Sequence, residues 1–149
     1  MGKDQVIIGV GFLLFNAKGQ IFVVEELKSK PEYFKEAGMW SFPLETFKSE
    51  DICPINTIPR LIKEEIGFPQ EQVVLLGFYK KPFKLIPNRS DILTFYGLGF
   101  FMGNKNTTPQ PKDDDIRFVG WKSPGELLTR SKIRIEVGPI LTDFQRRLN

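Results

Sequence analysis

The stretch that decides the fold runs from Gly38 to Phe68 and reads GMWSFPLETFKSEDICPINTIPRLIKEEIGF. Its second half predicts a short helix over 57–66, with Asn56 as the N-cap. Pro59 then lies in the first turn, where a missing backbone donor costs nothing. Gly67 follows the last helical residue, and glycine is expected there because it enters the left-handed region without a Cβ penalty.

Two adjacent carboxylates, Glu64 and Glu65, fall in the last turns of this helix. They lie near the negative end of the helix dipole, where cations are favoured. The pair therefore indicates either a bound divalent cation or a solvated polar face. Leu61 is one turn earlier and lies near the same face as both glutamates, whereas Ile58 and Ile62 take another side and are expected to pack on a sheet.

The whole stretch resembles the Nudix box, whose pattern is G-x5-E-x7-R-E-U-x-E-E-x-G-U, where U is a bulky apolar residue, after a strand end of the type W-x-x-P-G-G. Here 40–43 reads WSFP, and 60–68 reads RLIKEEIGF, in register with R, U, E, E, G and U. The chain departs from the pattern at three positions. Leu61 stands where the box has the glutamate after arginine, and Leu44 and Glu45 replace the glycine pair.

The first glutamate of the box is also displaced. The segment from Pro43 to Arg60 is one residue longer than usual, so counting back from Arg60 places that glutamate at Ile52. Counting forward from Pro43 places it at Asp51, with Glu50 beside it. Either acid is a candidate to replace the missing one, and a loop acid that serves only solubility is the other interpretation.

The resemblance implies an α/β fold, a Nudix-type α/β/α sandwich with a mixed sheet. It also implies a hydrolase that cleaves the pyrophosphate of a nucleoside diphosphate linked to another group, with Mg²⁺ or Mn²⁺ neutralising the phosphate oxygens. In that scheme Glu64 and Glu65 are metal ligands, joined by Glu50 or Asp51. Arg60 would orient a glutamate through a bidentate pair.

Residues outside the box are further candidates. Asp114, within the acidic triplet 113–115, is the candidate for a catalytic base, and a solvated charge run is the alternative. Lys80 and Lys81 are candidates to bind phosphates, although lysines between strands are common on surfaces. Phe78 is a candidate to stack on a base, although aromatic residues in strands more often belong to the core.

The loss of a carboxylate at Leu61 leaves two functions open. The first is a metal-dependent Nudix hydrolase acting on a nucleotide-sugar, a dinucleotide or an NTP-like pyrophosphate. The second is a catalytically impaired Nudix-fold protein that binds a nucleotide or RNA as a regulator. The intact Glu64–Glu65 pair favours the first, and Leu61 with the missing glycine pair favours the second. The expected partner is a small-molecule nucleotide pyrophosphate rather than nucleic acid, and a homodimer is compatible with the family.

The composition restricts the chemistry. The 149 residues, 41% of them hydrophobic and 26% charged, predict a single domain over 1–149. The absence of histidine removes imidazole bases, imidazole ligands and Ser-His-Asp schemes, and leaves carboxylates, Lys, Tyr, water and oxygen-bound metals. Cys53 is the single cysteine, which agrees with a reducing, cytoplasmic setting. The apolar run 6–15 is too short to span a bilayer, so no membrane is expected.

Apolar and aromatic runs predict the strands, and caps and periodicity predict the other helices. Polar loops are expected at 26–38 and 104–115. Ser123 as N-cap, with Glu126 three residues later, opens a helix through about Thr129. Apolar residues at helical spacing predict a closing helix over 137–148. The expected strands cover 6–15, 21–24, 39–42, 73–78, 83–86, 91–102 and 116–121.

Overall fold

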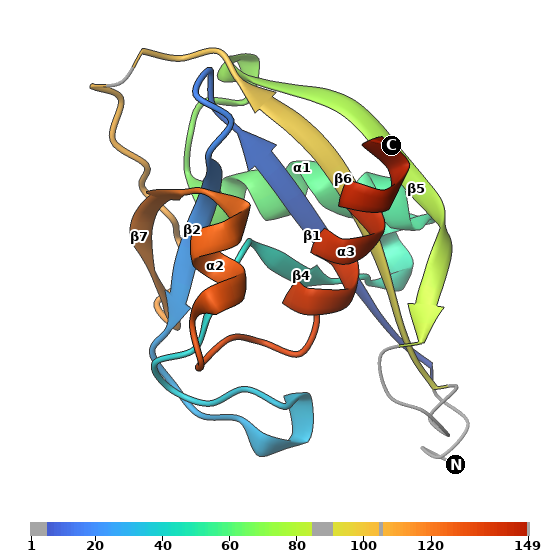
Figure 1. Ribbon diagram of the computed structural model, residues 1–149. Helices are drawn as coiled ribbons and strands as arrows, with labels where there is room; N and C mark the ends of the chain where they lie inside the picture. Colours follow the sequence, from blue (N-terminus) through green and yellow to red (C-terminus); the bar gives the residue numbers. More distant parts are fainter. Residues whose placement is uncertain (1–5, 85–90, 105, 149) are drawn as a thin grey trace.

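The computed structural model describes residues 6–84, 91–104 and 106–148. One mixed sheet forms its centre, with the strand order β3-β2-β1-β6-β5, while β4 pairs with β1 and β7 with β2 (Figure 1). β1 and β6 are parallel, and the other pairs are antiparallel. The strands are β1 (Ile7–Phe15), β2 (Ile21–Glu26), β3 (Trp40–Ser41), β4 (Leu44–Thr46), β5 (Val73–Lys84), β6 (Ile92–Phe101) and β7 (Ile116–Lys122).

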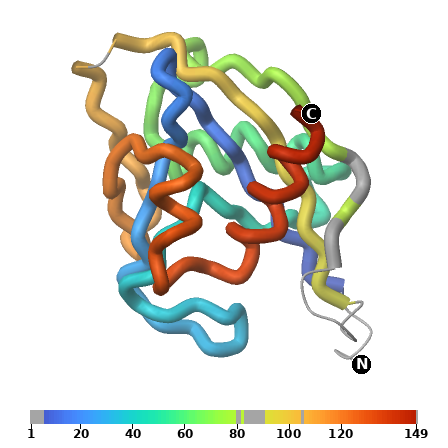
Figure 2. The backbone as a smooth tube through the Cα atoms, in the orientation of Figure 1, coloured from blue at the N-terminus to red at the C-terminus, as the bar shows by residue number. Residues whose placement is uncertain are grey.

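Helices cover both faces of the sheet (Figures 1 and 2). One face carries the helix of the Nudix-like stretch, which contains α1 (Ile58–Leu61), and the other carries α2 (Pro124–Thr129) and α3 (Val137–Leu148). The predicted α/β sandwich with a mixed sheet is confirmed. Short 3-10 turns lie at Pro31–Tyr33, Ser49–Asp51 and Gln70–Gln72.

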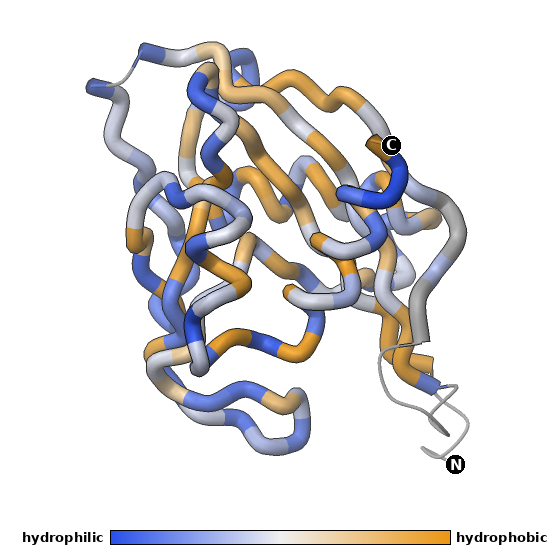
Figure 3. The backbone as a smooth tube through the Cα atoms, viewed as in Figure 1, coloured by the Kyte–Doolittle hydropathy of each residue, from blue (hydrophilic) through white to orange (hydrophobic). Residues whose placement is uncertain are grey.

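Alternating side chains of the central strands build one apolar cluster on each face. Phe12 and Leu14 of β1 pack under the Nudix-like helix, whereas Leu13 packs under α2 and α3. Figure 3 shows the hydrophobic residues concentrated along the central strands, with hydrophilic residues on the loops. In the part of the chain that the structure describes, no helix is both long and apolar enough to cross a bilayer.

Several local predictions are confirmed. β1 and β2 form a hairpin through a turn in which the Asn16 side-chain oxygen accepts from the backbone N–H groups of Lys18 and Gln20, both at 3.0 Å. The Ser123 Oγ accepts from the Glu126 N–H at 3.1 Å, and the Glu126 carboxylate accepts from the Ser123 N–H at 3.1 Å. This reciprocal capping box starts α2 where the sequence placed it.

Three predictions need correction. The two strands expected at 73–78 and 83–86 are largely one, because β5 continues through Lys84 with irregular register between Tyr79 and Phe83; residues 85 and 86 lie outside the described part. β4 was not predicted, since three residues are too few for a recognisable pattern. Asn56 is not the N-cap, because helical structure already begins at Pro54, and the Asn56 side chain instead donates to the Asp51 carbonyl at 2.9 Å.

Candidate functional site

The site lies where the sheet divides. β1 and β2 are paired only at Phe15 and Ile21. The segment 40–46 then supplies a strand to each of them, β3 on β2 and β4 on β1. A pocket of about 300 Å³ lies beside this division, lined by the loop after β2, by parts of β1, β4 and β6, by Glu65, and by segments before β7 and α3.

The helix of the Nudix-like stretch carries Glu65 to the pocket wall. Its backbone is helical from Pro54 to Ile66: a 3-10 turn (Pro54–Thr57), α1, and a widened π turn (Ile62–Ile66) that the Gly67 N–H closes onto the Ile62 carbonyl at 2.7 Å. Gly67 has φ 81°, the left-handed cap that the sequence predicted. Glu65 is only 7% exposed, although a glutamate side chain in water is charged at neutral pH.

The loop segment 110–113 is bound to the end of this helix through its backbone. The N–H groups of Lys112 and Asp113 both donate to the Glu64 carbonyl, at 2.9 and 3.0 Å, and the Gln110 N–H donates to the Gly67 carbonyl at 3.2 Å. A Cβ on Gly67 would lie 2.0 Å from the Gln110 carbonyl carbon, so only glycine permits this approach. The docking places Asp113 beside Glu65.

β4 brings a further carboxylate to the same helix. Glu45 is the register partner of Val10, whose side chain packs in the cluster under the helix, so Glu45 points to the helix face. There it lies within hydrogen-bonding reach of Glu64, just as Glu65 lies within reach of Asp113. Four acids from three distant parts of the chain therefore meet as two carboxyl pairs.

The electrostatics of these pairs follow from burial and like charge. Burial raises the pKa of Glu65 to about 9, and the charges of Asp113 and Glu45 add to the effect. Burial also raises the pKa of Glu45 to about 6, assisted by its hydrogen bond with Glu64. Each pair therefore favours an added positive charge, either a proton or a cation.

The donor chemistry fits a hard divalent cation, because carboxylate oxygens are the ligands that Mg²⁺ and Mn²⁺ prefer. Among the described residues, however, no three acidic side chains are already placed at metal-ligand positions. Glu45, Glu64, Glu65 and Asp113 would have to turn towards one ion. A bound cation would relieve the like-charge contact within each pair.

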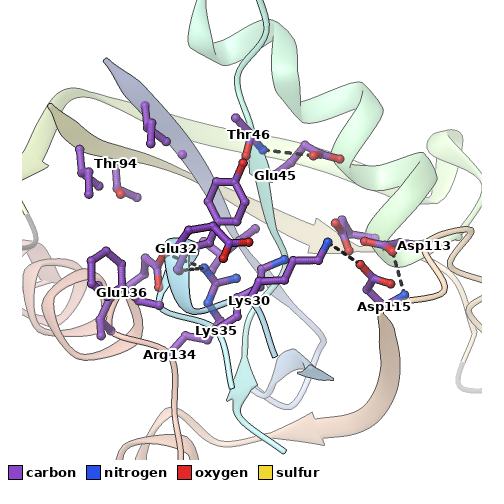
Figure 4. A pocket seen from close by; sticks show the side chains of 18 of the residues that line it. Lys30, Glu32, Lys35, Glu45, Thr46, Thr94, Asp113, Asp115, Arg134 and Glu136 are labelled. Atoms are coloured by element: carbon purple, nitrogen blue, oxygen red, sulfur yellow. Dashed lines mark hydrogen bonds and ion pairs between the residues drawn. The ribbon is translucent and has the colours of Figure 1, made fainter. Parts of the chain in front are cut away.

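Cationic side chains stand next to the acids. Lys30 pairs with Asp115 at 2.8 Å, and Lys28 with the same carboxylate at 3.0 Å. These hydrogen bonds lower the pKa of Asp115 to about 2. Figure 4 shows Asp113 and Asp115 at one end of the pocket, Lys30, Lys35 and Arg134 along its middle, and Glu136 at the other end.

Arg60 and Asp51 form a pair away from the pocket wall. Both Arg60 Nη atoms donate to the Asp51 carboxylate at 3.0 to 3.2 Å, and Nη2 also donates to the Thr46 carbonyl at 2.6 Å. The Asp51 carboxylate accepts further hydrogen bonds from the Lys48 N–H and the Thr57 hydroxyl. Its acceptor capacity is largely used by the protein. Glu50 is exposed and accepts from the neighbouring Ser49 hydroxyl.

The other sequence-based candidates lie as follows. Leu61 is fully buried in the apolar cluster, one turn before the buried Glu65. Asp114 is exposed, and its neighbour Asp113 is the one that lines the pocket. Phe78 stacks on Phe95, with ring centroids 5.9 Å apart, and packs against the cluster under the helix. The side chains of Lys80 and Lys81 lie outside the described part of the structure.

Comparison with known proteins assigns the family. The family model described as NUDIX domain matches residues 6–144. The chain therefore belongs to the Nudix family, as the sequence resemblance indicated. A comparison with curated protein sequences gave no match.

Solved structures share the fold at low sequence identity. The MutT protein from Methanosarcina mazei Go1 is 16% identical, with a TM-score of 0.66 over 97% of this chain and 96% of that one. The NUDIX domain of Shewanella oneidensis NrtR, complexed with ADP ribose, is 13% identical, with a TM-score of 0.63 over 97% and 89%. A bifunctional NMN adenylyltransferase/ADP ribose pyrophosphatase from Francisella tularensis, complexed with AMP and a Mn ion, is 16% identical, with a TM-score of 0.67 over 97% and 42%.

Proposed function

We propose that this protein is a metal-dependent pyrophosphohydrolase that cleaves a nucleoside diphosphate linked to a further group. One observation carries the proposal: Glu45, Glu65 and Asp113 line the same pocket as the cations Lys30 and Lys35. The carboxylates would hold a divalent cation, and the lysines would bind the phosphate charge that the cation leaves unneutralised.

Glu45, Glu64, Glu65 and Asp113 are the residues that would hold Mg²⁺ or Mn²⁺. When bound, the ion supplies charge neutralisation at the phosphate oxygens and orients the attacking water. Glu65 and Glu64 were expected in this role from the box. Glu45 replaces a glycine of the pattern, and its carboxylate offsets the one that is missing at Leu61.

The remaining residues position these groups. Arg60 connects the helix to the Thr46 carbonyl, next to Glu45, and so fixes the strand that presents that carboxylate. We propose that Asp51 serves Arg60 rather than the metal. We propose that Asp113, rather than Asp114, is the acid of this loop that takes part in the site, because it lines the pocket beside Glu65. The roles of Lys80, Lys81 and Phe78 in substrate binding stay predictions.

A second function is favoured by the burial of Leu61. The helix presents one carboxylate fewer than the box pattern, and the described acids form pairs rather than a ready set of three. A Nudix-fold protein that binds a nucleotide without hydrolysing it is compatible with this arrangement. A hydrolase and a binding protein would both keep the cationic side chains of the pocket, so nucleotide binding alone does not distinguish the two functions.

Turnover separates the two functions. The purified protein is incubated with ADP-ribose, NADH, diadenosine polyphosphates and NTPs, with Mg²⁺ or Mn²⁺, and release of phosphate and nucleoside monophosphate is measured. We expect cleavage of at least one substrate, which EDTA and Glu65→Gln abolish. Glu71→Gln, an exposed acid beyond the helix, is the matched control and should retain activity. Binding without metal-dependent cleavage would support the second function instead.

A further inference from the structure

The pocket has a second, chemically different end. Glu136 lies there, immediately before the first residue of α3, and Figure 4 shows it far from Asp113 and Asp115 across the pocket. The pocket lining also includes the apolar side chains of Ile7, Ile92 and Ile135, the last of which directly precedes Glu136. At the first end Asp113 has the carboxyl group of Glu65 as its neighbour, whereas Glu136 is paired with Arg134.

The two carboxylate oxygens of Glu136 differ in their partners. Oε2 accepts from Arg134 Nη2 at 3.0 Å. Oε1 is buried, and among the described residues it has no hydrogen-bond partner. The side chain as a whole is 13% exposed. A buried charged oxygen without a partner costs free energy, so this position favours a ligand that donates a hydrogen bond.

Arg134 fixes the orientation of Glu136. Its side chain is 7% exposed, and Nη1 donates to the buried Glu26 carboxylate at 3.3 Å. Its backbone N–H donates to the Trp40 carbonyl at 3.1 Å, which attaches the segment to β3. Arg134 is held by the Glu26 carboxylate and by the Trp40 carbonyl. Glu136 therefore cannot turn away from the pocket without losing its ion pair with Arg134.

We propose that Glu136 is a specificity-determining residue that accepts a hydrogen bond from the nucleoside part of the substrate. This inference rests on the proposed function, which places the phosphates at the opposite end. A phosphate is excluded at Glu136 by like charge, whereas a sugar hydroxyl or a base N–H has the required donor. The apolar lining suits a base or a sugar ring.

The variant Glu136→Gln tests the position sharply. Arg134 can donate only to the oxygen of the new amide, so the amide nitrogen takes the place of Oε1. An acceptor that faces the ligand is thereby replaced by a donor of the same size. Glu136→Asp is the second variant, because it keeps the charge for Arg134 and draws the acceptor back by one methylene. Glu36→Gln, on the exposed loop, is the control.

Binding is measured by calorimetry in Mg²⁺ with nucleoside monophosphates, so that no turnover is required. The probes are GMP against IMP, AMP against purine riboside monophosphate, and each ribonucleotide against its 2′-deoxy form, which separates base donors from sugar donors. For wild type and Glu36→Gln, we expect removal of one donor to weaken binding by about tenfold or more. That difference should fall to about twofold or less in Glu136→Gln and Glu136→Asp.

Two results would overturn the inference. One is equal discrimination between probes in wild type and both Glu136 variants. The other is a wild type that binds every probe equally, or none. Neither depends on cleavage, so a failure here is distinct from a failure of the proposed hydrolase, which is judged by metal-dependent turnover and Glu65→Gln.

Discussion

Arg60 donates to Asp51 and to the Thr46 carbonyl with the same nitrogen, Nη2, at 3.0 and 2.6 Å. One guanidinium thus connects three segments: the 3-10 turn before the helix, the helix itself and β4. Glu45 precedes Thr46 directly, so the position of this carboxylate depends on Arg60. The same geometry makes Asp51 a partner of Arg60, and this assignment can be tested against the metal-ligand role that the box pattern suggests.

Asp51→Asn should therefore reduce stability more than metal affinity. Loss of the charge weakens a half-buried ion pair, and we expect the free energy of unfolding to fall by about 1 kcal/mol. Glu45→Gln should instead weaken Mn²⁺ binding by about tenfold while stability changes little. Urea unfolding and Mn²⁺ titration of both variants check this. The opposite ranking of Mn²⁺ affinities would identify Asp51 as the ligand.

Leu61→Glu should destabilise the protein. Leu61 is fully buried in an apolar cluster, and a charge placed there without a partner loses its hydration. We expect a loss of about 3 kcal/mol without metal ions, against about 1 kcal/mol for the volume-conserving control Leu61→Met. Thermal unfolding with EDTA measures both variants. A Leu61→Glu protein as stable as the wild type would show that this position opens onto the site.

Ile52→Gly should stabilise the protein. Ile52 has φ 72° and ψ −49°, a strained combination for a β-branched residue, and its side chain is 84% exposed, so little packing is lost. We expect a gain of about 1 kcal/mol in unfolding free energy, read from urea denaturation. Ile52→Ala keeps a Cβ in the same conformation and should gain less. A destabilised glycine variant would disprove the strain.

The buried Asp143 should make the free energy of unfolding decrease at low pH. Burial alone would raise its pKa, but hydrogen bonds from Tyr96, Arg147 and Arg146 outweigh this and lower it to about 2. A lowered folded-state pKa contributes stability above the unfolded value near 4, and this contribution is lost as the pH falls through 2.

The pH-dependent contribution of Asp143 is about 2 kcal/mol. At pH 6, the free energy of unfolding of Asp143→Asn should therefore be lower than that of wild type by at least about 2 kcal/mol. Near pH 2, this difference between variant and wild type should be smaller by about 2 kcal/mol. Urea unfolding of both proteins at pH 6 and pH 2 measures the difference. A gap of constant size would mean that Asp143 is not held ionised by its partners.

Local patterns predicted the local parts of the fold. The Asn16–Gly19 turn, the capping box of Ser123 and the glycine that ends the helix each follow from residues within a few positions of one another. The predicted N-cap role of Asn56 was wrong and β4 was missed, because contacts outside the immediate segment decide both. The Asn56 side chain donates to the Asp51 carbonyl, and β4 exists through its pairing with β1.

The candidate site was likewise predicted where its residues share a local motif, and missed where they come from distant segments. Glu64 and Glu65 were found because they belong to one helical motif. Their partners Glu45 and Asp113 come from β4 and from a loop whose backbone binds the end of the helix, and neither contact has a sequence pattern of its own. The only available signals were the unusual Glu45 after Pro43 and the acidic triplet, which did not show which of its members faces inward.

Mn²⁺ titration followed by electron paramagnetic resonance tests the central claim most directly, because it needs no knowledge of the substrate. We predict that the wild-type protein binds Mn²⁺, that Glu65→Gln weakens this binding by about tenfold or more, and that Glu71→Gln leaves it unchanged. A wild type that leaves all Mn²⁺ free in solution, or equal affinity in all three proteins, would contradict the account.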